Sequence, residues 1–299
     1  MLSIRKYALT NYVFTCVFQV IICTGCTTEQ TFIAKDLTSE GIFSSNIEGP
    51  IWRDSCWFVV NFGKDGTIGT VTESGETALL LDLPEGSNAN AIKFDSEGWM
   101  LLADWPMHNI LRVHVPDRKV TILVHDSTFH QPNDLDINFT DRIYASDPDW
   151  KHETGRIWMV EPTGKAVIVK DSMGTTNGIT LDPSEKILYV NESVQRRIWA
   201  FDVNEAGHLS GQRLFASFDD FGLDGMKCDR AGNLYVTRHG KGTVCIFSPD
   251  GKLVRQIQLK GKKPSNLAFG GKDGRTCIVT MQDRGSIEYF RTDIPGKGF

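Results

Sequence analysis

The sequence lacks the features that would place it among nucleic-acid-binding or membrane-spanning proteins. Its 299 residues carry 32 lysines and arginines against 37 aspartates and glutamates, a formal net charge of −5, so it has no basic surface for a polyanion. No apolar run after the first 26 residues is long enough to span a bilayer. There is also no G-x-S-x-G, no H-E-x-x-H and no Walker loop, which excludes three common kinds of catalytic or nucleotide site.

Cysteine is sparse outside the N-terminal segment and never has the C-x-x-C spacing of a metal or redox site. We interpret the remaining cysteines as buried small apolar residues, each on a predicted strand: Cys56, Cys228, Cys245 and Cys277. The alternative is a disulfide between Cys228 and Cys245, which fall in one repeat and would pair in an oxidising compartment.

Residues 1–26 have the order of an export signal. Arg5 and Lys6 give a positive start, residues 13–23 are mostly apolar, and the small residues Thr24-Gly25-Cys26 follow. The last three also resemble a bacterial lipoprotein box, although Cys23 stands where that motif usually has leucine. We therefore expect an exported protein, periplasmic or lipid-anchored at a bacterial envelope, with a plain secretory signal or an uncleaved anchor as alternatives to lipidation. Residues 27–299 would form the folded domain.

Six similar segments fill this domain. Each begins with an oxygen-bearing side chain, continues as an alternating strand, turns, and returns as a second strand. Their first residues, here called the heads, are spaced 42, 43, 44, 47 and 41 residues apart: Glu48, Asn90, Asn133, Asn177, Asp224 and Ser265. Short strands at this period, with no helical pattern, predict an all-β fold, a six-bladed β-propeller. The sixth repeat lacks an outer strand, so we expect residues 32–37 to supply it and close the ring.

The heads are the candidate functional residues. The first strand of a propeller blade lies nearest the central channel, so the six heads should converge there. All carry oxygen, two are carboxylates and none is Cys or His, which favours a hard divalent cation, Ca²⁺ before Mg²⁺, Mn²⁺ or Zn²⁺. The alternative is that Asn-Gly and Asp-Gly only form turns where the strands begin, but that does not explain Glu48.

The second strand of each blade returns to the same face and should place polar residues around the channel mouth. Taken singly, most of these could be solvated loop residues: Asn61, Asp104, Trp105, Asp147, Asp149, Trp150, Asn191, Glu192, Arg238, His239 and Gln282. Together, a polar rim with two tryptophans suits a polyhydroxylated ligand. The insertion at residues 151–154 is a candidate substrate lid.

Several motifs resemble the senescence marker protein (regucalcin)/gluconolactonase/luciferin-regenerating-enzyme family. They extend over the mature chain: Glu48-Gly49-Pro50-Ile51-Trp52, Pro132-Asn133-Asp134, Tyr144-Ala145-Ser146-Asp147-Pro148, Thr176-Asn177-Gly178-Ile179, Asp224-Gly225-Met226 and Pro264-Ser265-Asn266-Leu267-Ala268-Phe269-Gly270-Gly271. The resemblance implies a channel metal, commonly calcium, held by Glu48, Asn177 and Asp224, with Asn133 as a ligand or substrate contact. It also implies hydrolysis of sugar lactones such as gluconolactone, with Asp224 as the candidate general base.

These expectations combine into a hypothesis of metal-assisted ester hydrolysis. The cation would stabilise the oxyanion, and Asp224, its pKa held low by the cation, would take a proton from water. Besides Asn133, the expected substrate contacts are Asp147, Asp149, Trp150 and Arg238. Asp149-Trp150 replace the Pro-Tyr-Gly run of many bacterial members, which leaves the lactone open. The alternatives are a phosphotriesterase-like hydrolase on the same metal site and a non-catalytic propeller that binds a sugar or protein. We expect a monomer or dimer whose only membrane contact is N-terminal.

Overall fold

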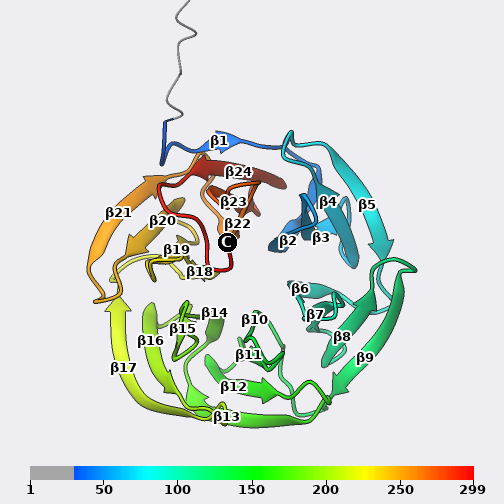
Figure 1. The fold of residues 1–299 in the computed structure, drawn as a ribbon, viewed down its shortest axis with the longest axis vertical. Coiled ribbons are helices and arrows are strands. Elements are labelled where there is room, and N and C mark those ends of the chain that lie inside the picture. The colour runs from blue at the N-terminus through cyan, green and yellow to red at the C-terminus, as the bar shows by residue number, and fades with distance from the viewer. Residues whose placement is uncertain (1–29) are drawn as a thin grey trace, which may run out of the picture.

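The structure, a computed structural model, describes residues 30–299. It shows six four-stranded antiparallel sheets arranged around a central axis (Figure 1). This confirms the predicted all-β, six-bladed propeller. In the described part of the chain no helix is long and apolar enough to cross a membrane. The predicted export signal at residues 1–26 lies outside the described residues and stays a prediction.

Each blade runs from an inner strand at the axis to an outer strand at the rim. Blade 1 consists of β2 (Phe43–Arg53), β3 (Cys56–Phe62), β4 (Thr67–Val71) and β5 (Thr77–Asp82). Blade 2 consists of β6 (Ala89–Phe94), β7 (Met100–Asp104), β8 (Asn109–His114) and β9 (Lys119–His125). Blade 3 consists of β10 (Leu135–Ile137), β11 (Ile143–Asp149), β12 (Thr154–Val160) and β13 (Ala166–Met173). Blade 4 consists of β14 (Thr176–Leu181), β15 (Ile187–Glu192), β16 (Arg197–Val203) and β17 (Leu209–Ser217). Blade 5 consists of β18 (Met226–Cys228), β19 (Leu234–Arg238), β20 (Thr243–Phe247) and β21 (Leu253–Gln258). Blade 6 consists of β22 (Pro264–Gly270), β23 (Thr276–Met281) and β24 (Ser286–Arg291), and β1 (Lys35–Asp36) completes it.

The ring is closed between the two ends of the described chain. Strand β1 pairs antiparallel with β24, with Lys35 opposite Tyr289 and Asp36 opposite Glu288 (Figure 1). Backbone hydrogen bonds extend the contact beyond the strand, from Phe32 N to Arg291 O at 2.8 Å. The predicted closure is therefore confirmed, and it covers the edge that β24 would otherwise expose.

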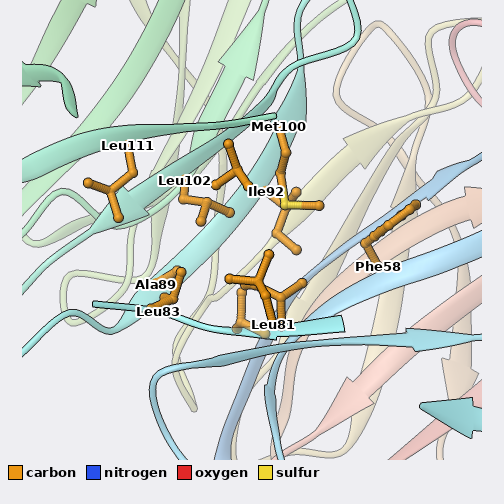
Figure 2. Packing of buried hydrophobic residues seen from close by; sticks show 11 residues of the cluster. Phe58, Leu81, Leu83, Ala89, Ile92, Met100, Leu102 and Leu111 are labelled. Carbon is orange, nitrogen blue, oxygen red and sulfur yellow. The ribbon is translucent and has the colours of Figure 1, made fainter. Parts of the chain in front are cut away.

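The hydrophobic core lies between blades, because neighbouring residues of a strand face opposite sides of the sheet. In β3, Phe58 and Val60 pack against blade 2, whereas Trp57 and Val59 pack against blade 6. Figure 2 shows the first of these layers, where Phe58 approaches Ile92 and other apolar side chains of the next blade. Burial of such a side chain contributes about 1.5–3 kcal/mol, so every blade depends on both neighbours for stability.

The cysteines of the described chain are free thiols. Cys228, Cys245 and Cys277 are buried and Cys56 is half-buried, as expected for small apolar residues. Burial raises the pKa of the Cys228 and Cys277 thiols well above the ordinary range, so they are unreactive. The alternative disulfide between Cys228 and Cys245 is not formed.

Candidate metal and active site

The inner strands are irregular where the heads lie. In β2, β6 and β14, the pairing register with the second strand shifts next to Glu48, Asn90 and Asn177. In blades 3 and 5 the inner strand begins only after the head, at Leu135 and Met226. An interruption of the ladder leaves a residue unpaired and redirects its side chain. The heads are thus free to point towards the axis.

Five of the six heads line one axial cavity of about 310 Å³. They are Glu48, Asn90, Asn133, Asn177 and Asp224. The rest of the wall comes from residues at the ends of second strands and from loops: Trp150, Ser193, His239 and Gln282. The structure therefore brings together residues that lie far apart in the sequence, including all four predicted metal ligands.

The head of blade 6 does not reach this cavity. The hydroxyl of Ser265 is fully buried, donates to Ile47 O at 2.7 Å and lies 2.8 Å from Thr280 Oγ1. The prediction that all six heads converge on the channel is therefore wrong for Ser265. Blade 6 contributes Gln282 to the cavity instead, and its Asn266 side chain lies beside Glu48, whose pKa it lowers.

Two glycines that follow the heads explain how the inner strands can approach one another. Neither Gly178 nor Gly225 has a positive φ, so neither is required by a left-handed turn. A Cβ on Gly178 would lie 2.2 Å from Asp224 O, and one on Gly225 would lie 2.0 Å from Asn266 Oδ1. These glycines allow contact with the next blade, so the turn interpretation does not account for them.

The cavity places two carboxylates in contact with each other. Glu48 is buried, and burial raises its pKa to about 8 even though Gly49 N–H donates to Oε2 at 2.7 Å; the charge of Asp134 adds to the rise. Burial and the neighbouring Glu48 raise the pKa of Asp224 well above its ordinary value, against a hydrogen bond from Asn177. Two such groups ionise together only when a positive charge compensates them.

The donor atoms fit a hard divalent cation. Glu48 and Asp224 supply carboxylate oxygens, Asn177 lies beside Asp224, and Asn133 Oδ1 is buried with no hydrogen-bond partner among the described residues. An orphaned amide oxygen beside two crowded carboxylates matches calcium, which accepts mixed oxygen ligands. Residues 30–299 contain no cluster of three His, Cys, Asp or Glu side chains suited to a metal, so the fit depends on the amides.

A second cavity of about 200 Å³ shares Asn90, Asn133, Trp150 and Gln282 with the first. Its other lining residues are also uncharged: Asn46, Asn61, Trp105 and Gln131. Sequence analysis missed Asn46 and Gln131, and also Ser193 in the first cavity. Asn46 and Gln131 each precede a head by two residues, so they hold equivalent positions in two repeats, and this shared position was a signal for them.

The structure places Asp147, which was expected to bind substrate, away from both axial cavities. It is fully buried and lines neither axial cavity. Its Oδ1 accepts the backbone N–H groups of His130 (2.8 Å) and Gln131 (2.7 Å), and its Oδ2 accepts Trp158 Nε1–H at 2.9 Å. The side chain therefore holds the connection that leads into the inner strand of its own blade. A substrate contact does not fit this placement.

Arg238 is likewise turned away from the axis. It is 1% exposed, and its guanidinium donates to Asp220 Oδ1 at 2.7 Å and stacks on the Phe218 ring, 3.5 Å from the centroid. Like Asp147, it holds the segment that leads into an inner strand. Arg238 is the last residue of β19 and points away from the cavity, whereas His239, in the turn that follows, lines it.

The two predicted substrate residues at the end of β11, Asp149 and Trp150, have different surroundings. Asp149 accepts the His152 backbone N–H at 3.1 Å and lies 2.6 Å from His152 Nδ1, and this contact lowers the Asp149 pKa. Asp149 thus shapes the loop without lining either axial cavity. Trp150, 41% exposed, lines both cavities, which is the position expected for a substrate contact.

The fold and this site define a class: a six-bladed propeller with a cluster of carboxylate and amide oxygens on its axis. Comparison with known proteins identifies the family. Residues 48–283 match the family model described as the SMP-30/Gluconolactonase/LRE-like region. The chain belongs to this family, which confirms the resemblance found in the sequence motifs.

Individual relatives are distant in sequence. A gluconolactonase of Zymomonas mobilis is 27% identical over 270 residues, covering 78% of this chain and 75% of the relative. A pentonolactonase of Haloferax volcanii is 23% identical over 244 residues, covering 78% and 80%. Among solved structures, a regucalcin from Agrobacterium tumefaciens described as a calcium-binding protein gives a TM-score of 0.75 at 20% identity, covering 86% and 92%. This last similarity shows the fold.

Proposed function

We propose that this protein hydrolyses sugar lactones with the help of a divalent cation, Ca²⁺ before other ions, bound by Glu48, Asn133, Asn177 and Asp224. One observation carries the proposal: two carboxylates in contact and an orphaned amide oxygen face an axial cavity that shares its wall with a second, uncharged cavity. The names of the relatives, gluconolactonase and pentonolactonase, support the same reaction.

The axial residues would divide the chemistry between them. When bound, the cation would supply the charge that polarises the lactone carbonyl and stabilises an oxyanion. Glu48, Asn133 and Asn177 hold their oxygens in fixed positions towards the axis. The Asp224 carboxylate accepts a proton from the attacking water, and the proton passes to the ring oxygen as the C–O bond of the lactone breaks. The product is an open-chain hydroxy acid.

The second cavity is the binding region for the sugar hydroxyls. Its lining combines amide side chains with Trp105 and Trp150, which provide hydrogen-bond donors and acceptors and two aromatic faces. Asn133 and Trp150 line both cavities, so they connect the reacting carbonyl with the polyol part of the substrate. Hydroxyl-rich lactones suit this lining better than apolar ones.

The test compares aldonolactones with other esters in the presence of calcium or a chelator. We expect gluconolactone or a pentonolactone to be hydrolysed with added Ca²⁺ and activity to disappear with EGTA. Asp224→Ala should abolish turnover and weaken calcium binding together, whereas Asp250→Ala, in an exposed hairpin, should change neither. Hydrolysis of a fluorophosphate but of no lactone would contradict the proposal and indicate a phosphotriesterase. Calcium-dependent stability without any turnover would indicate a binding protein.

A further inference from the structure

A larger cavity lies at the other end of the channel. In each inner strand the head comes first along the chain, whereas this back cavity, of about 580 Å³, is lined by residues at or just after the strand's end. The C-terminal segment also lines it, through Lys297 and Phe299, in agreement with the central position of the C terminus in Figure 1. Its volume is within the range of small-molecule sites. The proposed lactonase reaction does not use it.

Three lysines line the back cavity, and each lies within 4 Å of one of two carboxylates. Lys93 Nζ lies 2.8 Å from Asp136 Oδ1, and Lys297 Nζ lies 3.5 Å from Asp136 Oδ2. Lys227 Nζ lies 3.5 Å from Asp134, which does not line the cavity. The lysines hold the pKa of the buried Asp136 far below its usual range, so it is ionised. Within 4 Å of their ammonium groups, the three lysines thus meet two carboxylates.

The lysines also have unused hydrogen-bonding capacity. Each ammonium carries three donors, but within residues 30–299 Lys297 makes one hydrogen bond, to Leu181 O at 3.3 Å, besides the long contact with Asp136. Lys227 has two long contacts of 3.5 Å, one with Asn266 Oδ1 and one with Asp134. An anionic group with several acceptor oxygens would satisfy these donors.

The acidic residues nearer the rim take up none of the lysine donors, because each is bonded to another group. Asp95 accepts from Arg112 at 2.7 Å. Asp141 accepts the Ser96 backbone N–H at 2.8 Å, and Glu185 accepts the backbone N–H of Phe139 at 3.0 Å. The remaining cation, Arg53, lies over the Phe94 ring.

The walls above the lysines are aromatic. They are formed by Trp52, Phe94, Phe139, Phe269 and Phe299, and Phe139 is 79% exposed. An exposed phenylalanine at a cavity mouth has apolar surface that a ligand can cover. A ligand that matches both parts carries a negative charge at one end and an apolar body at the other.

We propose that the back cavity binds an organic monocarboxylate with an apolar body. The carboxylate accepts hydrogen bonds from Lys93, Lys227 and Lys297, and the apolar body lies against the aromatic rings. Charge-assisted hydrogen bonds fix the carboxylate, and burial of apolar surface supplies the rest of the affinity. This site is separate from the axial cavity lined by Glu48 and Asp224, here called the front cavity, and does not depend on the proposed reaction.

Calorimetry with 4-phenylbutyrate tests the proposal. We expect saturable 1:1 binding, at least about tenfold weaker binding of the neutral amide 4-phenylbutyramide because the charged hydrogen bonds are lost, and no detectable binding of acetate, which lacks the apolar body. Equal affinity for the acid and the amide, or no binding of either, would overturn it.

Variants locate the site. Lys297→Gln should weaken phenylbutyrate binding about tenfold, whereas Lys272→Gln, an exposed lysine outside the back cavity, should leave it unchanged. Phe139→Ala removes an exposed ring, so it should fold normally and still bind several-fold more weakly. Asp224→Ala should bind as the wild type does. Loss of binding in Asp224→Ala with full binding in Lys297→Gln would place the carboxylate at the front cavity and overturn the proposal.

Discussion

The contact between Glu48 and Asp224 should make the stability of the cation-free protein depend on pH. Burial raises the pKa of Glu48 from its ordinary value of 4.5 to about 8, so the folded state holds this proton more tightly than the unfolded state. The stabilisation is fully present below about pH 4.5 and is lost as the pH rises through about 8. The raised pKa of Asp224 acts in the same direction.

The magnitude follows from the rise in pKa. Each tenfold change in proton affinity corresponds to about 1.4 kcal/mol, so the rise from 4.5 to about 8 amounts to about 5 kcal/mol for Glu48. For a chain of about 300 residues, 1 kcal/mol changes the melting temperature by about 2 °C. The glutamine side chain of the Glu48→Gln variant is uncharged at every pH. In a chelator, this variant should therefore match the wild type near pH 5 and melt about 10 °C higher near pH 8.5.

Thermal unfolding of wild type and Glu48→Gln across this pH range, with EGTA and with Ca²⁺, measures the effect. Calcium should restore the wild type at high pH, because a cation favours the ionised carboxylates, and should have little effect on Glu48→Gln. The control is Glu76→Gln, which changes an exposed glutamate in the outer part of blade 1 and should follow the wild type. A difference between wild type and Glu48→Gln that stays constant from pH 5 to pH 8.5 would refute the reasoning.

Three further predictions separate structural residues from site residues. Asp147→Ala should lower the free energy of unfolding by about 3 kcal/mol, because one buried donor and two half-buried donors lose their acceptor; a changed KM with unchanged urea unfolding would contradict this. Trp150→Ala should raise KM for the lactone several-fold, with calcium affinity and melting temperature unchanged, since this exposed ring lines both axial cavities; steady-state kinetics decide. Gly225→Ala should weaken calcium binding at least about tenfold in calorimetry, because its methyl group would collide with Asn266 beside Glu48; wild-type affinity would show that the close approach is dispensable.

Much of the fold could be predicted because the blade is a local unit. The alternation of apolar residues, the turns and the repeat spacing are properties of consecutive residues, and the chain end that lacked a strand indicated where the ring closes. The heads could be found for the same reason, since equivalent positions of equivalent repeats must lie at equivalent distances from the axis. Glu48, Asn133, Asn177 and Asp224 indeed line one cavity.

The direction of individual side chains could not be predicted in this way. Ser265 holds a head position but bonds to a neighbouring backbone. Asp147 lies near the end of β11 and Arg238 is the last residue of β19, but both point into blade connections. A side chain at a strand end can turn to either side, and its direction depends on which unpaired backbone groups of the adjacent connection require a partner.

The sequence by itself determined the number of blades, the ring closure and the chemical type of the axial side chains, because these depend on repeat length and residue identity. Tertiary structure alone decided which polar residues share a cavity, how strongly Glu48 and Asp224 disfavour each other's charge, and that a lysine-lined back cavity exists. These properties arise from distances between blades, and residues from different blades meet only when all six inner strands have packed around one axis.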